Sequence, residues 1–450
     1  MTATLTPTVT ATNTLTPTAT LTPTITATPT VTATATATKT ATPTTTATQT
    51  QTPTATPTSV NAPGTSASTL VISGQSNQTY SGLTISTTNG DCVDIINSTN
   101  ITIENSNIGP CGTNNSTAPS NGIFISGGSG VNIFDSYVHV QNQSTGCCDS
   151  HDGVFIKYSS QDTVQGNVIA YNETNIETFK SSNITLTGNF LLNPQGPFPR
   201  GQQIQDGVGS NDTITDNFLL STPDTTLGPA IGTANTAPIP YSQDNTGNRP
   251  SDSLNIYSTQ YADVEHNYIS GGLDATTPGS GGAQASSGCG LIADGSNTIG
   301  SNNSSFISNI LVNTGQCAIG IATGTTQTVI NNRSISLNSD SGGQTADYIW
   351  SQYTAACGPV LLNGNIASLI RSDGYSSGYW NGGGCNPITC DGTNTNIDSC
   401  NTFDYGSGRA AYNALISDPA VNNPPLIPPL PKNCVASSPY STQTSAAPCS

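Results

Sequence analysis

The chain has 450 residues, only 8% of them charged, and 26 acidic groups against nine Lys and Arg give it a formal net charge of −17. This negative charge argues against a nucleic-acid-binding protein and against attachment to an anionic membrane. It also disfavours tight binding of a polyuronate over most of the surface, because like charges repel unless calcium bridges them. Gly supplies 45 residues and Met only one, so there is little helix-forming material.

Residues 1–62 form a separate low-complexity tract, in which Thr occupies every even position from Thr2 to Thr58. Its prolines and β-branched residues cannot build a core and favour an extended chain. We expect a stalk, because Thr/Pro-rich tracts of this kind are typical O-glycosylated spacers of surface and secreted proteins. The strict alternation also permits a second interpretation, in which the tract lies as a long β-strand along a neighbouring subunit.

After the tract, one short phrase recurs nine times: an alternating strand, a small or polar residue, a polar residue that is almost always Asn, and two apolar residues. Strands this short bury their apolar side only by stacking coil on coil, which predicts a solenoid of about eleven coils. Asn at the same bend of each coil places one side-chain amide over the next, where each can donate and accept. The polar markers of this predicted ladder are Asn107, Ser136, Asn167, Asn189, Asn217, Asn267, Asn309, Asn332 and Asn365.

The repeat and the Asn ladder resemble the right-handed parallel β-helix of the pectin-lyase-like superfamily. The resemblance covers roughly residues 66–400 and implies an all-β fold. We expect the right-handed parallel β-helix to occupy residues 63–405, followed by a C-terminal cap and Pro-rich tail over 406–450. The alternative is an antiparallel β-sandwich with Asn-Gly hairpins.

The β-rich part contains twelve cysteines, an even number typical of disulfide-bonded proteins from oxidising compartments. Cys289 and Cys317 occupy equivalent places in consecutive coils, so we predict a disulfide between them. Cys357 and Cys385 are expected to form a second pair. Cys92 has three candidate partners, which are Cys111, Cys147 and Cys148. A C-terminal cluster is expected to staple the cap, and it consists of Cys390, Cys400, Cys434 and Cys449. No close Cys pair is accompanied by His, so no metal site is predicted.

Ionisable side chains are concentrated between Asp149 and Asp206, on three successive coils of the expected solenoid. Alignment of DGVFIKYS with NIETFKSS places Lys157 over Lys180 and sets three carboxylates near the starts of adjacent strands. The candidate catalytic residues are Asp152, Lys157, Glu177, Lys180, Arg200 and Asp206. The candidate substrate-binding residues are His151, Gln202, Trp350, Tyr379 and Trp380.

Members of the superfamily that this chain resembles bind polymers along an outer sheet and use two chemistries. A glycoside hydrolase needs a protonated carboxyl group and a carboxylate. A polysaccharide lyase needs a Lys, Arg or His base, with calcium or Arg to neutralise the uronate carboxylate. The chain has pieces of both, but it lacks the Asp-Asp and Gly-His motifs of the polygalacturonase branch and the acidic calcium cluster of the pectate-lyase branch. Hydrolase and lyase therefore both stay open, and calcium is expected only for a lyase.

These features favour a secreted or cell-surface protein that binds or processes extracellular polysaccharide along an outer sheet. One alternative is a non-catalytic structural surface protein, an adhesin or a fibre subunit that assembles with itself, and another is a phage tail-spike-like module. The chain has no visible secretory signal and no apolar run long enough to span a bilayer. We expect an extracellular or cell-surface location, reached through a leader or upstream domain outside this chain.

Overall fold

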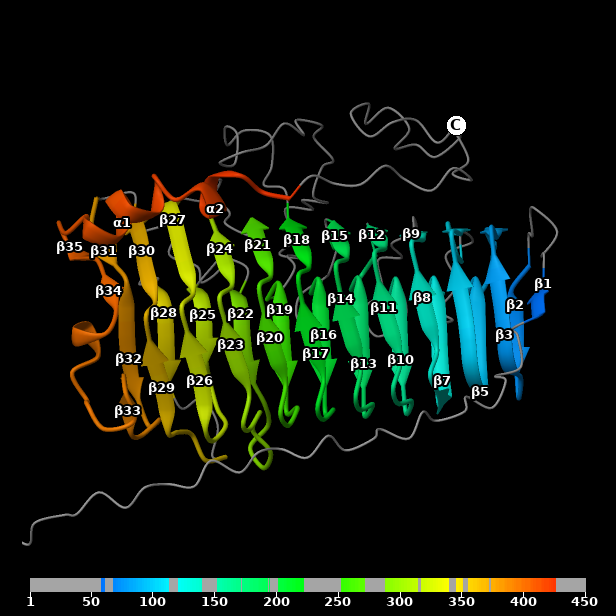
Figure 1. Cartoon of the computed structure of the whole chain (residues 1–450), viewed down its shortest axis with the longest axis horizontal. Coiled ribbons are helices and arrows are strands. Elements are labelled where there is room, and N and C mark those ends of the chain that lie inside the picture. The colour runs from blue at the N-terminus through cyan, green and yellow to red at the C-terminus, as the bar shows by residue number, and fades with distance from the viewer. Residues whose placement is uncertain are drawn as a thin grey trace, which may run out of the picture. The chain divides into compact units, whose positions relative to one another are not determined.

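The structure is a computed structural model. It describes residues 58–60, 68–112, 120–139, 152–170, 172–192, 194, 201–221, 252–271, 288–314, 317–339, 345–350, 355–371 and 374–425. Nearly all of the elements are strands, which stack side by side as the coils of a parallel β-helix (Figure 1). The predicted β-helix is confirmed and the β-sandwich alternative is wrong, because neighbouring strands run parallel and only β31 (Ser376–Ser377) pairs antiparallel. Of the Thr-rich tract, only β1 (Thr58–Val60) lies among the described residues.

Each coil contributes one strand to each of three faces. Face 1 has eleven strands, which matches the expected number of coils: β2 (Leu70–Ser73), β5 (Val93–Glu104), β7 (Ile123–Ser129), β10 (Val154–Lys157), β13 (Ile176–Phe179), β16 (Ile204–Gly207), β19 (Leu254–Tyr257), β22 (Cys289–Asp294), β25 (Cys317–Ile321), β28 (Thr345–Trp350) and β32 (Tyr379–Gly383).

The second half of the long strand β5 belongs to face 2, so faces 1 and 2 are joined there. The other strands of face 2 are β1, β3 (Ser76–Ser81), β8 (Asn132–Phe134), β11 (Thr163–Gln165), β14 (Thr185–Thr187), β17 (Thr213–Thr215), β20 (Asp263–Glu265), β23 (Ser305–Ile307), β26 (Gln327–Ile330), β29 (Val360–Asn363) and β33 (Ile388–Thr389).

Face 3 forms a separate sheet. Its strands are β4 (Thr84–Ile85), β6 (Asn107–Ile108), β9 (Tyr137–His139), β12 (Val168–Ala170), β15 (Phe190–Leu192), β18 (Phe218–Ser221), β21 (Tyr268–Gly271), β24 (Ile310–Val312), β27 (Arg333–Ser339), β30 (Ile366–Arg371), β31, β34 (Thr402–Phe403) and β35 (Tyr405–Gly406).

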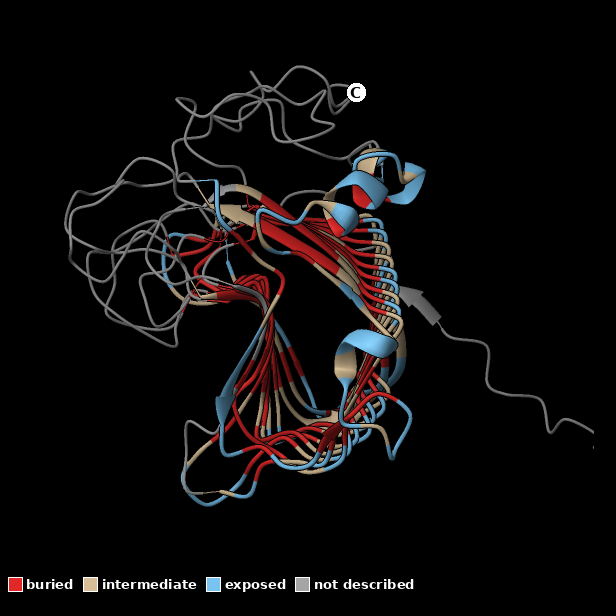
Figure 2. Ribbon diagram, turned by 90° about the vertical axis from the view of Figure 1, so that its left-hand side faces the viewer, coloured by how far each residue is buried: buried red, intermediate tan, exposed pale blue. Residues whose placement is uncertain are grey.

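The core fills the space that the three faces enclose, and its buried residues come from all three of them. Figure 2 colours the buried residues red along the stacked strands. The alternation of side chains along each strand produces this core. Val154 and Ile156 of β10 and Ile176 of β13 are fully buried, and the residues that alternate with them along each strand point outward. Aligned coils stack about 4.8 Å apart, so each inward residue packs on its counterpart in the next coil.

The bend from face 2 to face 3 explains the recurring phrase. It contains two residues in every coil but the last, where 390–401 separate β33 from β34, and the first of the two takes a left-handed backbone conformation, as at Asp135, Gly166, Asp216 and His266. A small or polar residue suits that position, since bulky side chains rarely adopt positive φ. The second residue of the bend is the rung of the ladder.

The rungs form one continuous column of buried side chains. From Asn167 onward the Nδ2 of each rung donates to Oδ1 of the next rung at 2.9–3.1 Å. The same Oδ1 also accepts the backbone N–H of the preceding rung, one coil away. The column continues past Asn365 to Asn401, a rung that the sequence pattern did not predict. The placement of Asn107 in the column was wrong. Ser106 is the rung beside Ser136, whereas Asn107 begins β6 and lies 3.1 Å from His139 Nε2.

Four disulfides join described cysteines: Cys92–Cys111, Cys289–Cys317, Cys357–Cys385 and Cys390–Cys400. The two predicted cross-coil pairs are among them, and Cys92 bonds to one of its three candidate partners. Cys147, Cys148, Cys434 and Cys449 lie outside the described residues.

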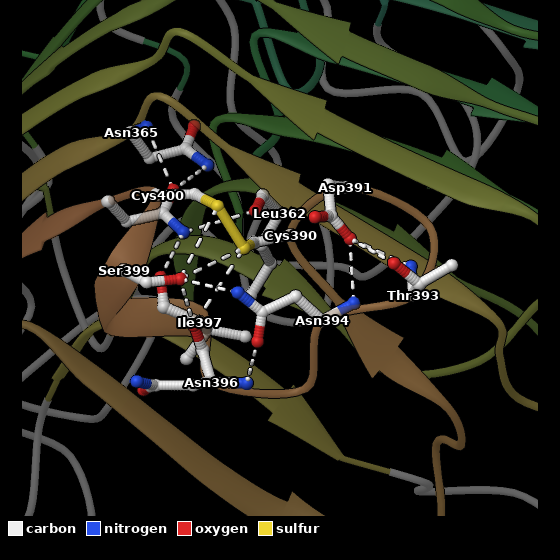
Figure 3. Close-up of a disulfide and its surroundings, with 11 residues drawn as sticks. Leu362, Asn365, Cys390, Asp391, Thr393, Asn394, Asn396, Ile397, Ser399 and Cys400 are labelled. Carbon is white, nitrogen blue, oxygen red and sulfur yellow. Dashed lines mark hydrogen bonds between the residues drawn. A yellow bond between two sulfur atoms is a disulfide. The ribbon is translucent and has the colours of Figure 1, made fainter.

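The Cys390–Cys400 loop closes the ladder at its C-terminal end (Figure 3). Asn401 follows the disulfide directly, and its Nδ2 donates to the carbonyls of Leu362 and Ile397, the latter in the 3-10 helix η1 (Ile397–Ser399). Asp391 fixes the loop by accepting hydrogen bonds from Thr393 and Asn394. The last rung therefore has partners for both of its donor hydrogens.

Two short helices cover part of face 3 from outside. Helix α1 (Ala410–Leu415) packs on β27 and β30, and α2 (Pro419–Asn422) packs on β24. The Tyr268 hydroxyl donates to the carbonyl of Val421 at 2.7 Å, and both residues join Phe218 and Leu220 in an outer apolar cluster. None of the helices that the structure describes has the length and apolar composition to span a bilayer.

Candidate functional site

The candidate site lies on the outer side of face 1, where the alternation of the strands turns every second residue outward. Strand register places six of these residues side by side, and we call them the outer row: Asp94, Phe124, Phe155, Glu177, Gln205 and Asn255. They come from β5, β7, β10, β13, β16 and β19, at equivalent positions. The row therefore combines two carboxyl groups, two phenyl rings and two amides along the solenoid axis.

Asp152 precedes β10 at the bend that enters face 1, and Glu177 lies on β13 of the next coil. Their side chains are 1% and 6% exposed, and a hydrogen bond joins them. Burial raises the pKa of Asp152 well above its usual range, and the charges of Glu177 and Glu173 add to that shift. Burial also raises the pKa of Glu177 to about 7, while the hydrogen bond from Asp152 and the Lys157 cation act in the opposite direction.

The two carboxyl groups therefore differ in protonation. Asp152 keeps its proton and donates it toward Glu177, which ionises near neutral pH. Such a difference between neighbouring carboxyl groups suits acid–base chemistry, in which one supplies a proton and the other activates a nucleophile. Buried Glu173, from the segment between β12 and β13, is the third acidic residue of this cluster.

Lys157 and Lys180 lie beside the pair, but not one over the other as the sequence alignment predicted. Lys157 pairs in register with Phe179, and Lys180 is one residue further on, opposite Tyr158. The predicted register was wrong by one residue, because the apolar positions of β10 and β13 both have to face the core and only the observed shift allows it. The ammonium of Lys157 lies 5.4–5.8 Å from the ring centres of Phe155, Tyr158 and Phe179, and that of Lys180 lies 5.1 Å from Phe179.

Asp206 does not join the pair. The sequence alignment placed it near the start of a strand, like Asp152 and Glu177, but it lies within β16, in register with Thr178 and Ile256, and points into the core. Thr178 Oγ1 donates to it at 2.6 Å, and it shares a hydrogen bond with Asp212. Burial raises the pKa of Asp206 to about 6, and burial followed by the charge of Asp206 raises that of Asp212 to about 9. This carboxyl pair is an internal feature of the solenoid.

The remaining predicted site residues are spread along the chain. Gln202 is buried at the bend that enters β16, where Thr174 Oγ1 donates to it at 3.4 Å. Trp380 is 45% exposed in the last strand of face 1, and Tyr379 beside it stacks on Phe403, so both are far along the axis from Glu177. Arg200, His151 and the side chain of Trp350 lie outside what the structure describes.

Sequence reasoning missed a second carboxyl pair, Asp91 and Asp94. A hydrogen bond joins them, and burial followed by that hydrogen bond raises the pKa of Asp91 to about 7. Oδ1 of Asp91 accepts from the backbone N–H and the side chain of Asn121 at 2.5 and 3.1 Å. The signal was present in the sequence: Asp91, Asn121 and Asp152 each lie at the start of a face 1 coil, two residues before its first inward residue.

The described residues do not supply a calcium site. Within the described ranges, no group of three or more His, Cys, Asp or Glu side chains is arranged to hold a metal ion. The arginines in those ranges are Arg333, Arg371 and Arg409, and none lies on face 1. These residues therefore place no calcium ligand set beside the Asp152–Glu177 pair, and no step is derived through calcium.

Comparison with known proteins supports the fold. A family model described as a right handed beta helix region matches residues 68–227. The matched region is a right-handed β-helix. A search of curated proteins found no match to the sequence.

Several solved structures are similar to the chain at low identity. The Dettilon tailspike protein shows 10% identity and a TM-score of 0.45, with 67% of this chain and 54% of that chain covered. A double mutant of the periplasmic alginate epimerase AlgG shows 11% identity and a TM-score of 0.44, with 69% of this chain and 64% of that chain covered. The Streptococcus pneumoniae surface protein and adhesin PfbA shows 15% identity and a TM-score of 0.43, with 69% of this chain and 77% of that chain covered. The chain thus spans less than two thirds of the first two structures, and no activity is transferred from any of them.

Proposed function

We propose that this protein hydrolyses an extracellular polysaccharide on the outer side of face 1. Glu177 is the group that exchanges a proton with the departing glycosidic oxygen or with the attacking water, and Asp152, hydrogen-bonded to it, holds the proton that sets its charge. The observation that carries the proposal is the hydrogen-bonded Asp152–Glu177 pair, whose members hold their protons with different strength. Hydrolysis is proposed because the pair supplies two carboxyl groups whose pKa values are raised, whereas the Arg that a lyase would use, Arg200, lies outside the described residues.

The experiment is a reducing-end assay of the whole chain on a panel of polysaccharides. We expect Asp152→Asn and Glu177→Gln each to lower the rate at least about a hundredfold, the usual size for loss of an acid or base. Glu265→Gln, an outward carboxyl on face 2, is the matched control and should leave the rate unchanged. Ultraviolet-absorbing unsaturated products in place of new reducing ends would establish a lyase instead, and a rate that both site variants retain would refute the assignment.

A second candidate function, a non-catalytic fibre subunit or adhesin, is favoured by the unbroken ladder from Ser106 to Asn401. A column of buried, mutually hydrogen-bonded side chains stiffens the solenoid along its axis. If no polysaccharide is cleaved and the purified chain forms larger species as its concentration rises in analytical ultracentrifugation, this function is supported over hydrolysis.

The organisation around the solenoid is also a proposal. We infer that residues 1–62 are an O-glycosylated stalk and that 406–450 form a cap and tail beside a β-helix of residues 63–405. The four disulfides support an oxidising, non-cytoplasmic compartment such as the cell exterior or surface. Mass spectrometry of proteolytic fragments of the native protein, before and after chemical removal of O-linked sugars, tests the stalk, since a change confined to residues 1–62 is expected.

A further inference from the structure

The Asp91–Asp94 pair lies on the same outer surface as the Asp152–Glu177 pair. Asp94 begins the outer row on β5, and Glu177 continues it three strands further on. With about 4.8 Å per step, the two carboxyl groups are roughly 14 Å apart along the axis, a length that a short oligosaccharide spans. Oδ1 of Asp94 is buried and has no hydrogen-bond partner among the described residues.

Phe124 and Phe155 fill the row between the two pairs. Their ring centres are 5.5 Å apart, and strand register places Phe124 beside Asp94 and Phe155 beside Glu177. Phe124 is partly exposed and Phe155 nearly buried. Flat apolar rings flanked by hydrogen-bonding groups are the usual composition of a site for a sugar, which has apolar C–H faces and a hydroxyl rim.

Beyond Glu177 the row continues with two uncharged amides, Gln205 and Asn255. Both are more than nine-tenths buried, and Oδ1 of Asn255 has no partner within the described part of the chain. An unpaired buried amide oxygen costs stability, which makes it a candidate acceptor for a ligand hydroxyl.

The row itself contains no cation. Lys157 and Lys180 are next to it, but their ammonium groups lie over the rings of Phe155, Tyr158 and Phe179. A uronate carboxylate on the row would face Asp91, Asp94 and Glu177, in a chain whose net charge is −17. An uncharged sugar avoids that repulsion and can use both carboxyl and amide groups as partners.

We propose that the glycan bound on face 1 is uncharged and that it runs from the Asp152–Glu177 pair over Phe155 and Phe124 to a second binding subsite formed by Asp91 and Asp94. The inference rests on the proposed hydrolysis for the place of the bound polymer, but it concerns binding and does not need cleavage.

Isothermal titration calorimetry on the whole chain carrying Asp152→Asn tests the proposal without turnover. The probes are uncharged gluco-, manno- and xylo-oligosaccharides, with oligogalacturonate and oligoalginate as the charged comparison. For the uncharged ligand that binds best, we expect Phe124→Ala to weaken binding about tenfold, near the value of one stacked ring. We expect Asp94→Asn to weaken it by a similar factor.

Two variants from the same coils are matched controls. Phe134→Ala removes an outward phenyl from β8 on face 2, and Glu104→Gln neutralises the face 2 end of β5, the strand that carries Asp94. Both should bind as the parent does. Tighter binding of a uronate oligosaccharide than of every uncharged one would overturn the proposal, as would equal losses in Phe124→Ala and Phe134→Ala. Binding that follows this pattern in a protein without hydrolytic activity would uphold the subsite and refute only the proposed reaction.

Discussion

Removal of one rung from the middle of the Asn ladder should destabilise the protein far more than removal of an ordinary surface Asn. Asn217 is 1% exposed. Its Nδ2 donates to Asn267 Oδ1 at 3.0 Å and to the Leu186 carbonyl at 2.9 Å. Its Oδ1 accepts the backbone N–H of Asn189 at 3.0 Å and the side-chain Nδ2 of Asn189 at 2.9 Å.

The size of the effect follows from which groups lose every partner in Asn217→Ala. Oδ1 of Asn267 keeps the backbone N–H of residue 217 at 3.0 Å, so it stays satisfied. The backbone N–H of Asn189 and one hydrogen of its Nδ2 lose their acceptor inside the solenoid. A buried donor left unsatisfied costs about 1–3 kcal/mol, so the two donors together cost about 2–6 kcal/mol in the free energy of unfolding.

Serine should recover part of that loss, because Ser136 already serves as a rung and its Oγ accepts the backbone N–H of Ser106 at 3.1 Å. We expect Asn217→Ser to cost roughly half as much as Asn217→Ala, since one of the two donors regains an acceptor. Chemical denaturation followed by far-ultraviolet circular dichroism measures the difference. Hydrogen exchange at the amide of Asn189 should accelerate in the alanine variant and less in the serine variant.

Asn132→Ala is the matched control. Asn132 is partly exposed on face 2, and its Nδ2 makes one hydrogen bond, to the Gly130 carbonyl at 3.1 Å. Its replacement should cost less than about 1 kcal/mol, because water can satisfy the freed carbonyl. If Asn217→Ala costs no more than Asn132→Ala, the ladder does not stabilise the solenoid in the way described.

Three further outcomes are expected. The free energy of unfolding should fall as pH rises from about 4 to about 9, because burial and a neighbouring carboxyl raise the pKa of Asp212 to about 9 in the folded chain. The contribution of the Asp212 proton to stability is complete below the unfolded-state pKa of about 4 and is lost as pH rises to the folded-state pKa. Asp212→Asn should flatten the upper part of a melting-temperature profile against pH, and an unchanged slope there would contradict the assignment. Lys157→Met should raise the pKa of Glu177 above its value of about 7, since a nearby cation is removed. Carbon-13 NMR titration of the Glu177 carboxyl measures this pKa, and an unchanged value would mean that Lys157 and Glu177 do not interact. Cys289→Ala combined with Cys317→Ala should lower the free energy of unfolding by about 3.5 kcal/mol, as expected for cysteines 28 residues apart in the sequence, and chemical denaturation under non-reducing conditions measures it; a variant as stable as the parent would contradict the disulfide.

Much of the fold could be predicted from the sequence because the solenoid repeats one local rule. The strand alternation, the two-residue bend and the Asn rung recur in coil after coil, so the stacking and two cross-coil disulfides followed from spacing. The rule failed where two adjacent residues satisfy it equally. Ser106 and Asn107 are both polar and both follow the left-handed Asn105, and only the register of β6 with β9 decides between them.

The site was harder to predict, because one residue of register decides whether a side chain faces the core or the solvent. Asp206 looked equivalent to Glu177 in sequence, yet Glu177 pairs with Gln205 and points outward, while Asp206 pairs with Thr178 and points inward. The partner of Asp206 is Asp212, at the next bend. No pattern within a single coil contains this information.

The three bends of each coil differ in how much length they tolerate. The bend that holds the ladder has two residues in every coil but the last, whereas the connection from face 3 to face 1 is short before β13 and much longer before β10, β19 and β22. Extra sequence can therefore accumulate at one corner of the solenoid without shifting a single rung. New segments inserted there border the outer side of face 1, so evolution or an engineer can alter what that surface recognises while the scaffold behind it stays constant.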